Sequence, residues 1–286
     1  MFVTGATSGI GLETARCFAK AGARVFMAGR DAKKLQECVD SVRREHQLLY
    51  SAAQTSAAPI DPEKVVPIIC DVSSLASVKK CIDEFKALNI PLDILINNAG
   101  CWLTNNPARV LTEDGFEMHL GTNHFGHFAL TNGLLPSLKA AGQSRVVNVS
   151  SVAHGRCAIK LNDLNFEKSE YDQFSAYGHS KTANILHAVA LHEKYFAAGV
   201  TAVSLHPGVI DTDLWRDGQI GARMNKTIPQ GAATQVWCAV SPDVISGNYY
   251  DNCAVQSAVK PYAVDKDIAM RFWDISMELT QVDVNK

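Results

Sequence analysis

Short apolar runs alternate with longer amphipathic stretches along the whole chain of 286 residues. The runs after the first lie at Arg24–Ala28, Val65–Cys70, Ile94–Asn97, Arg145–Ser150, Val200–His206 and Gly247–Tyr250. Several are nearly continuous in Val, Ile and Leu, which is typical of strands buried on both faces of a sheet. No linker or internal repeat interrupts the alternation. The pattern therefore predicts a single α/β domain over residues 1–286, a doubly wound parallel sheet of about seven strands with helices on both faces.

The first strand is expected to be short, because Met1-Phe2-Val3-Thr4 runs directly into a glycine-rich segment. Either this strand is unusually short, or the start of a longer parent has been lost. The glycines permit a tight turn and a close approach of the backbone to phosphate, and the helix that follows, Leu12–Ala21, offers its N-terminal amides. We expect a Rossmann-type pyrophosphate site, although the Gly-x-x-x-Gly-x-Gly spacing also fits an ordinary glycine-rich turn. Its residues are Gly5, Ala6, Thr7, Ser8, Gly9, Ile10 and Gly11.

The end of the second strand indicates which dinucleotide this site prefers. An NAD site usually places a carboxylate there for the ribose 2′-hydroxyl, whereas an arginine accommodates a 2′-phosphate. Arg30 occupies this position and favours NADP(H) over NAD(H). Asp31 follows directly, and we interpret it as the cap of the next helix, Ala32–His46. At the end of the third strand, Asp71 is expected to meet the adenine edge with Val72 against the ring, and Asp71 also fits a helix cap.

Tyr177 and Lys181 are four residues apart, a spacing that places both side chains on one face of a helix. A phenol titrates near pH ~10, too high for general acid–base catalysis near neutrality. An ammonium at roughly 5 Å, in an effective dielectric of about 20, stabilises the phenolate by about 3 kcal/mol. The pair is therefore a candidate acid–base catalyst, although an ordinary exposed pair on an amphipathic helix has the same pattern.

Several motifs follow one another in an order that resembles the short-chain dehydrogenase/reductase family. They are the glycine loop, Asn97-Asn98-Ala99-Gly100, Asn123, Ser150-Ser151, Tyr177 with Lys181, and His206-Pro207-Gly208. The long interval from serine to tyrosine and the later Gln230-Gly231-Ala232-Ala233 resemble the retinol dehydrogenase and WW-domain oxidoreductase branch, which includes relatives of protochlorophyllide reductase.

The resemblance implies a role for each matching residue. Tyr177 is the general acid in carbonyl reduction and the base in alcohol oxidation, and Lys181 lowers its pKa and binds the nicotinamide ribose. Ser151, rather than Ser150, is the oxyanion partner, with Ser150 a strand cap. Asn123 holds a water in a proton relay, or is only a satisfied core asparagine. The resemblance adds to the cofactor site Asn98, Ala99, Gly100, Pro207, Gly208 and Thr212.

Composition excludes several other classes of function. The 27 basic and 29 acidic residues leave a net charge of −2, which gives no reason to expect nucleic acid or an anionic membrane as a partner. The eight cysteines contain no C-x-x-C pair, so we expect reduced core thiols and no metal site. No apolar stretch of about 18 residues and no signal peptide occur in this chain, and we expect a soluble cytoplasmic protein without a membrane span.

These patterns predict an NADP-dependent oxidoreductase that transfers hydride between nicotinamide and a hydrophobic alcohol or carbonyl, of the retinoid, steroid or xenobiotic class. Loops 154–175 and 209–229 are candidate substrate walls, with Cys157, Ile159, Leu214 and Trp215 as apolar lining. A second hypothesis is a dinucleotide-binding scaffold or redox-responsive interaction module with little turnover. A homodimer through helices Thr112–Leu138 and Tyr177–Ala197, using Leu120, Phe125, Phe128, Leu186 and Leu191, is a further expectation, although these side chains also fit positions that face the sheet. Tyr50–Pro62 is expected to be a surface insertion.

Overall fold

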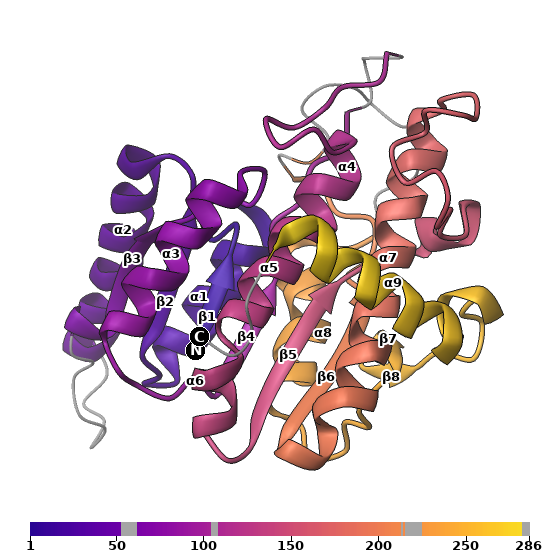
Figure 1. Cartoon of the computed structure of the whole chain (residues 1–286). Helices are drawn as coiled ribbons and strands as arrows, with labels where there is room; N and C mark the ends of the chain where they lie inside the picture. The colour runs from indigo at the N-terminus through magenta and orange to yellow at the C-terminus, as the bar shows by residue number, and fades with distance from the viewer. Residues whose placement is uncertain (53–61, 104–107, 213, 215–224, 282–286) are drawn as a thin grey trace.

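The computed structural model describes the chain except for residues 53–61, 104–107, 213, 215–224 and 282–286. Its centre is one sheet in the order β3-β2-β1-β4-β5-β6-β7-β8, parallel as far as β7 (Figure 1). The strands are β1 Phe2–Thr4, β2 Val25–Gly29, β3 Val65–Ile69, β4 Ile94–Asn97, β5 Ser144–Val149, β6 Val200–His206, β7 Tyr249–Asp251 and β8 Ala254–Val255. The predicted doubly wound fold is confirmed, and the short antiparallel β8 is an addition that its two residues did not indicate.

The short first strand lies in the middle of the sheet. Phe2 is in register with Phe26 of β2 on one side and with Leu95 of β4 on the other. Chain order reverses across β1 and β4, because β2 and β3 lie on one side and β5 to β7 on the other. In an open α/β sheet, ligands bind at the carboxyl ends of the strands at such a switch point. The glycine loop, which follows β1 directly, lies at that point.

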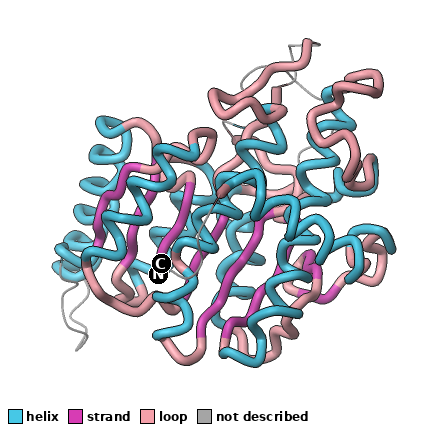
Figure 2. Tube along the Cα trace, in the orientation of Figure 1, coloured by secondary structure: helices cyan, strands magenta, loops and turns pink. Residues whose placement is uncertain are grey.

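Helices cover both faces of the sheet, as Figure 2 also shows. Helices α1 and α8 pack with Val3 and Val147 on one face, and α3, α5, α7 and α9 pack with Phe2 and Val146 on the other. The helices are α1 Gly9–Lys20, α2 Ala32–Ala52, α3 Leu75–Ala87, α4 Met118–Leu120, α5 Gly126–Gly133, α6 Leu135–Ala140, α7 Gln173–Tyr195, α8 Ile228–Val240 and α9 Lys266–Thr280. Both faces of the central strands are therefore buried, which explains their continuous apolar sequences.

The helix expected over Thr112–Leu138 is wrong at its start and is not continuous. Residues before Met118 form a turn in which the Thr112 amide donates to the Phe116 carbonyl at 2.8 Å, and Gly115 has φ +83°. A π-helical turn, Gly121–Phe125, then separates α4 from α5. In the sequence, the segment before Met118 is not set apart from the helical stretch that follows it. Gly115, however, has a positive φ, which is incompatible with a helix, so the helix begins only after it. The expected insertion at Tyr50–Pro62 falls mainly on residues outside the described ranges.

The residues expected to form a dimer interface lie in the core of this chain instead. Leu120, Phe125, Phe128, Leu186 and Leu191 are at most 1% exposed. Helix α9 accounts for part of this burial, because the edge of Phe128 meets Trp273 at a centroid distance of 4.8 Å and Phe125 lies 6.3 Å from Phe272. These side chains offer no surface to a second copy.

Candidate active site

The glycine loop between β1 and α1 has the geometry of a phosphate cradle. Gly5 and Gly9 have φ of +65° and +53°, a region that residues with a Cβ rarely adopt. At Gly11, a Cβ would lie 2.4 Å from the Gly5 carbonyl oxygen, so only glycine allows this turn to close on the helix. The Ala6 amide donates to the Ala28 carbonyl at 3.0 Å and ties the loop to β2. The loop is therefore closed and held against the sheet by its own backbone.

The start of α1 faces this loop with its first amides available. Ser8 is the N-cap residue, and its side chain makes no capping hydrogen bond. A Cβ on Gly9 would lie 3.1 Å from Cγ2 of Thr212, so Thr212 is adjacent to the cradle although it is 203 positions later in the chain. Thr7 lies against Gly29 at the end of β2, and Ile10 lies near Gly231 of α8. The helix N-terminus, with its positive dipole end, can accept an anionic group here.

The ends of β2 and β3 supply the next group of expected residues. Arg30 is exposed at the end of β2. The Lys34 amide donates to the Asp31 carboxylate at 3.0 Å, which bears out Asp31 as the cap of α2. Asp71 instead accepts from the Ser73 amide and hydroxyl, and the N-cap of α3 is Ser74. Asp71 as a helix cap is therefore wrong, because the helix begins one turn later.

The segment after β4 lies directly against the glycine loop. The Asn98 amide side chain donates to the Thr4 carbonyl at 2.8 Å, and the Thr4 hydroxyl accepts from the Asn98 and Ala99 amides at 2.9 Å. At Gly100, a Cβ would lie 3.2 Å from Asn123 Oδ1 and 3.6 Å from Lys181 Nζ. Gly100 therefore joins the cofactor loop to the expected catalytic residues.

Tyr177, Lys181 and Ser151 come together at the carboxyl end of β5. The Tyr177 side chain is 4% exposed, and the Ser151 hydroxyl lies near enough to its phenol to favour the phenolate. Lys181 Nζ lies 5.4 Å from the centre of the Tyr177 ring and donates to the Val149 carbonyl at 3.1 Å. The Ser150 hydroxyl points to α7 and donates to the Lys181 carbonyl at 2.7 Å. The two serines thus face different groups, as strand alternation predicts.

Burial, rather than the charge of Lys181, controls the pKa of Tyr177, and burial also controls the pKa of Lys181 itself. It raises the pKa of Tyr177 above its usual value, and the Ser151 hydroxyl only partly opposes this. Burial also lowers the pKa of Lys181 from 10.5 to about 8. The expected lowering of the tyrosine pKa by the lysine is therefore wrong for this arrangement, because desolvation of the phenolate outweighs a cation that lies over the ring.

Asn123 lies on the π-helical turn and has partners for both ends of its amide. Its Oδ1 accepts from the Cys101 amide at 2.8 Å, and its Nδ2 donates to the Cys101 carbonyl at 3.2 Å and the Ser180 hydroxyl at 2.9 Å. Its main-chain carbonyl accepts from His127 Nδ1 at 3.0 Å. The Asn123 side chain therefore has hydrogen-bond partners for its oxygen and its nitrogen, and it fixes the position of residue 101. The turn on which it lies is π-helical, and such turns are common at functional sites.

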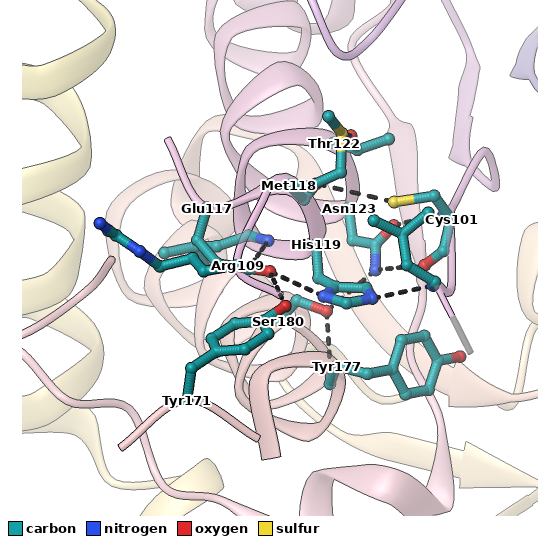
Figure 3. A network of polar contacts seen from close by, with 12 residues as sticks. Cys101, Arg109, Glu117, Met118, His119, Thr122, Asn123, Tyr171, Tyr177 and Ser180 are labelled. Atoms are coloured by element: carbon teal, nitrogen blue, oxygen red, sulfur yellow. Dashed lines mark hydrogen bonds and ion pairs between the residues drawn. The ribbon is translucent and has the colours of Figure 1, made fainter. Parts of the chain in front are cut away.

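Two buried residues that the sequence analysis missed, Glu117 and His119, support this part of the site together with the half-buried Tyr171 (Figure 3). The Glu117 carboxylate accepts from His119 Nδ1 at 2.7 Å, the Leu120 amide at 2.9 Å and the Tyr171 hydroxyl at 3.0 Å. Burial opposes its ionisation, but these hydrogen bonds prevail and lower its pKa. His119 Nε2 accepts from the Leu103 amide at 3.1 Å. A glutamate and a histidine two positions apart in an apolar stretch were the only sequence signal.

Hydrogen bonds on either side of residue 102 place Trp102 over the ring of Tyr177. Residue 101 is held by Asn123 and residue 103 by His119. Trp102, between them, stacks on the Tyr177 ring with centroids 4.2 Å apart and planes at 12°. In Figure 3 the Tyr177 hydroxyl points away from the glutamate–histidine pair. Trp102 therefore covers one face of the Tyr177 ring, and the Tyr177 hydroxyl is directed away from Glu117 and His119.

The segment after β6 is only partly described. Gly208 has φ +105°, and Lys226 Nζ donates to the Pro207 carbonyl at 3.1 Å. Of the expected substrate wall 209–229, Trp215 lies outside the described residues. In the other wall, 154–175, Cys157 is half-buried and Ile159 packs against the core. Within the described residues no helix is long and apolar enough to cross a bilayer.

A doubly wound sheet with a glycine cradle at its switch point defines a dinucleotide-binding protein. A sequence profile of the family described as short chain dehydrogenase matches residues 1–220. Human retinol dehydrogenase 11 is 38% identical over 99% of this chain and 86% of its own length, and short-chain dehydrogenase TIC 32 A, chloroplastic, of Brassica napus is 38% identical over 98% and 88%. The chain belongs to the short-chain dehydrogenase family, and it is an NAD(P)-dependent oxidoreductase related to the retinol dehydrogenases.

Solved structures share this fold. A crystal structure of an uncharacterised protein from Mycobacterium paratuberculosis superposes with a TM-score of 0.75 at 34% identity and covers 100% of this chain and 94% of its own. An NADPH-bound carbonyl reductase from chicken fatty liver superposes with a TM-score of 0.63 at 23% identity, covering 89% and 97%. The second likeness shows the fold alone.

Proposed function

We propose that this protein transfers hydride between NADP(H) and a hydrophobic alcohol or carbonyl compound, with Tyr177 as the acid–base group. The observation that carries the proposal is that Tyr177, Ser151 and Lys181 lie together at the carboxyl end of β5, with Lys181 Nζ 5.4 Å from the centre of the Tyr177 ring. Two neighbouring hydroxyls can both donate to one carbonyl oxygen. The retinol dehydrogenase relatives support an apolar substrate.

The residues of the cradle fit a dinucleotide. The closed glycine turn, the uncapped α1 N-terminus and Thr212 suit a pyrophosphate, and Arg30 suits a 2′-phosphate. The other residues proposed to hold the cofactor are Asp71, Val72, Asn98, Ala99, Gly100, Pro207, Gly208, Tyr177 and Lys181. When bound, the nicotinamide supplies or accepts the hydride.

Side chains of this protein transfer the proton that accompanies the hydride. In reduction Tyr177 donates its proton to the carbonyl oxygen, and Ser151 donates a hydrogen bond to the same oxygen. A raised tyrosine pKa keeps the phenol protonated and ready to donate at neutral pH, which favours reduction. In oxidation the phenolate must form, and binding of a second positive charge close to the ring would assist it. Asn123 keeps the 101–103 segment in place, and Lys181 holds the ribose.

The catalytic part of the proposal is tested with Tyr177→Phe. We expect at least a hundredfold loss of kcat/KM in the reduction of an aromatic aldehyde with NADPH, because phenylalanine has no hydroxyl proton to give to the carbonyl oxygen. Tyr195→Phe, on the same helix but far along it, is the matched control and should keep wild-type turnover. Full turnover by Tyr177→Phe would show that this mechanism is wrong.

Cofactor choice is tested separately by measuring the Kd of NADPH and NADH. We expect tighter binding of NADPH, and we expect Arg30→Ala to weaken NADPH by about tenfold while NADH changes little, because the 2′-phosphate loses its ion-pair partner. Lys33→Ala, an exposed lysine in the next helix, is the control. An unchanged preference after Arg30→Ala would remove the reason for choosing the phosphorylated cofactor.

The scaffold hypothesis has one observation in its favour, the stacking of Trp102 on Tyr177. A phenol that is 4% exposed and covered on one face is restricted in what it can reach. Trp102→Ala distinguishes the two functions. An enzyme limited by this cover should gain turnover of bulky carbonyl compounds, whereas a scaffold should bind NADPH and consume none before or after the substitution.

A further inference from the structure

Lys226 joins three parts of the structure beside the proposed cofactor site. Its ammonium donates to the Pro207 carbonyl at 3.1 Å and lies 3.6 Å from Oδ1 of Asp251. Pro207 follows β6, and Asp251 is the last residue of β7, in register with His206. Lys226 itself comes just before helix α8, which begins at Ile228. One side chain therefore ties the start of α8 to the carboxyl ends of two neighbouring strands.

The aliphatic part of Lys226 lies directly on the backbone of Gly208. A Cβ at Gly208 would lie 2.5 Å from Cδ of Lys226 and 3.0 Å from its Cε. Gly208 also has φ +105°, a conformation that residues with a Cβ rarely adopt. The lysine side chain is only 14% exposed. It therefore contacts this turn twice, through its ammonium at residue 207 and through its methylene groups at residue 208.

The backbone at Lys226 is held in place without the help of the ammonium. The Asn225 amide donates to the Val209 carbonyl at 3.0 Å, and the Val209 amide donates to Asn225 Oδ1 at 2.9 Å. On the other side, Thr227 and Gln230 form the capping box of α8. A cation just before a helix N-terminus opposes the helix dipole, so α8 gives no reason for a lysine at this position. The contacts of its side chain give one.

The place of Pro207 and Gly208 in the sheet indicates which half of a dinucleotide they meet. The strands run in the order β3-β2-β1-β4-β5-β6, and the glycine loop follows β1 at the centre. Arg30 and Asp71, expected at the adenosine half, follow β2 and β3 on one side. Residues 207 and 208 follow β6 on the other side, where Tyr177 also lies. A dinucleotide that spans the switch point therefore has its nicotinamide half near residues 207 and 208.

We propose that Lys226 is a positioning residue for the nicotinamide half of the cofactor. Its ammonium holds the Pro207 carbonyl, and its methylene groups hold the backbone of Gly208, in the conformation that meets the nicotinamide. Asp251 keeps the ammonium in place and compensates its charge, which is largely withdrawn from water. This inference rests on the proposed function for the place of the dinucleotide.

The test compares the Kd of NADPH with that of its adenosine half, adenosine 2′,5′-bisphosphate, by isothermal titration calorimetry. We expect Lys226→Met to weaken NADPH by about tenfold, because the Pro207 carbonyl loses a charged donor. The bisphosphate should bind as it does to the wild type, because it lacks the nicotinamide half. Asp251→Asn, which keeps the shape of the side chain, should weaken NADPH by about threefold with the same selectivity, because the ammonium loses its ion-pair partner.

Lys266→Met is the matched control for these variants. Lys266 also pairs with a carboxylate, that of Glu193, at 2.7 Å, but near the C-terminal end of α7. Its substitution should leave the binding of both ligands unchanged. If Lys226→Met weakens NADPH and the bisphosphate equally, or weakens neither, the proposal is overturned, because the lysine then serves the fold in general or nothing at this turn. Asp251→Asn gives the same comparison if Lys226→Met does not fold.

These binding measurements involve no turnover, so they are judged separately from the loss of aldehyde reduction in Tyr177→Phe. If NADH proves to be the tighter cofactor, the same comparison is made with NADH and AMP. An error in the choice of cofactor and an error in the role of Lys226 therefore give different results.

Discussion

Lys181 is a buried ammonium, and its burial has a predictable effect on stability. Its pKa is lowered from 10.5 to about 8. Between these two values the unfolded chain binds more protons than the folded chain, so stability rises with pH in that window. Below about pH 8 the folded protein carries the full penalty, roughly 3 kcal/mol. The charged form of Lys181 therefore destabilises the folded state.

We therefore expect Lys181→Met to raise the free energy of unfolding at pH 7 by about 2 kcal/mol, since the relieved penalty exceeds the lost hydrogen bond to Val149. Urea denaturation at pH 7 and at pH 10 measures it, and the advantage should shrink at the higher pH. Lys79→Met, at an exposed position, is the control. A variant less stable than the wild type at pH 7 would contradict this account.

At the scale of elements, the helix α5 packs so closely on the connection from β3 to α3 that one glycine decides the contact. A Cβ at Gly126 would lie 1.9 Å from the Val72 carbonyl oxygen, which is backbone. At Gly133, seven residues later, a Cβ would lie 2.4 Å from Ile82 Cδ1 and 2.9 Å from its Cγ1 and Cγ2, which are all side-chain atoms. The first clash requires the helix to shift, and the second requires the Ile82 side chain to move.

We expect Gly126→Ala to destabilise the protein by more than about 3 kcal/mol and to weaken NADPH binding, because Val72 moves with the helix. Gly133→Ala should cost about 1 kcal/mol or less, since helix propensity offsets part of the clash. Chemical denaturation of both variants and NADPH titration measure these effects. Equal losses from the two substitutions would show that α5 is not held against the Val72 backbone.

On the scale of the whole molecule, four buried histidines on the π-turn, α5 and α7 make the fold sensitive to acid. Burial lowers the pKa of His127 and His179 to about 4 and that of His187 to about 3, and it lowers the pKa of His124 well below 6.5. Below pH 6.5 the unfolded chain takes up protons that the folded chain refuses, so stability falls as pH falls.

By pH 5 each of these histidines should reduce the free energy of unfolding by roughly 2 kcal/mol. We expect cooperative loss of near-ultraviolet circular dichroism between pH 6 and 4.5. His187→Phe, which removes one such group from beside Trp273, should move the midpoint to lower pH. A midpoint unaffected by this substitution would mean that other groups control acid unfolding.

The packing of the whole molecule also determines the oligomeric state that we expect. Because α9 covers part of the apolar surface of α5 and α7, we expect a monomer of about 31 kDa in multi-angle light scattering at micromolar concentration. A stable dimer would show that a surface other than these helices mediates association.

Features that depend on near neighbours in the chain could be predicted from sequence. The strand β6 has the bounds expected from its apolar run, and Asp31 caps α2 as its position suggested. The helix over Thr112–Leu138 failed because one glycine at positive φ ends the pattern. Trp102 was missed because it stacks on Tyr177, which is distant in sequence. Glu117 and His119 are near neighbours, but their link to the site depends on the distant Tyr171 and Leu103.

Spacing and periodicity therefore determined the alternation of strands and helices, the glycine turn and the shared face of Tyr177 and Lys181, since these follow from backbone geometry over a few residues. Tertiary structure alone decided that Trp102 covers Tyr177, and it decided which groups are desolvated and with that the pKa of Tyr177. Desolvation sums over every atom packed around a group, and most of those atoms belong to segments far away along the chain.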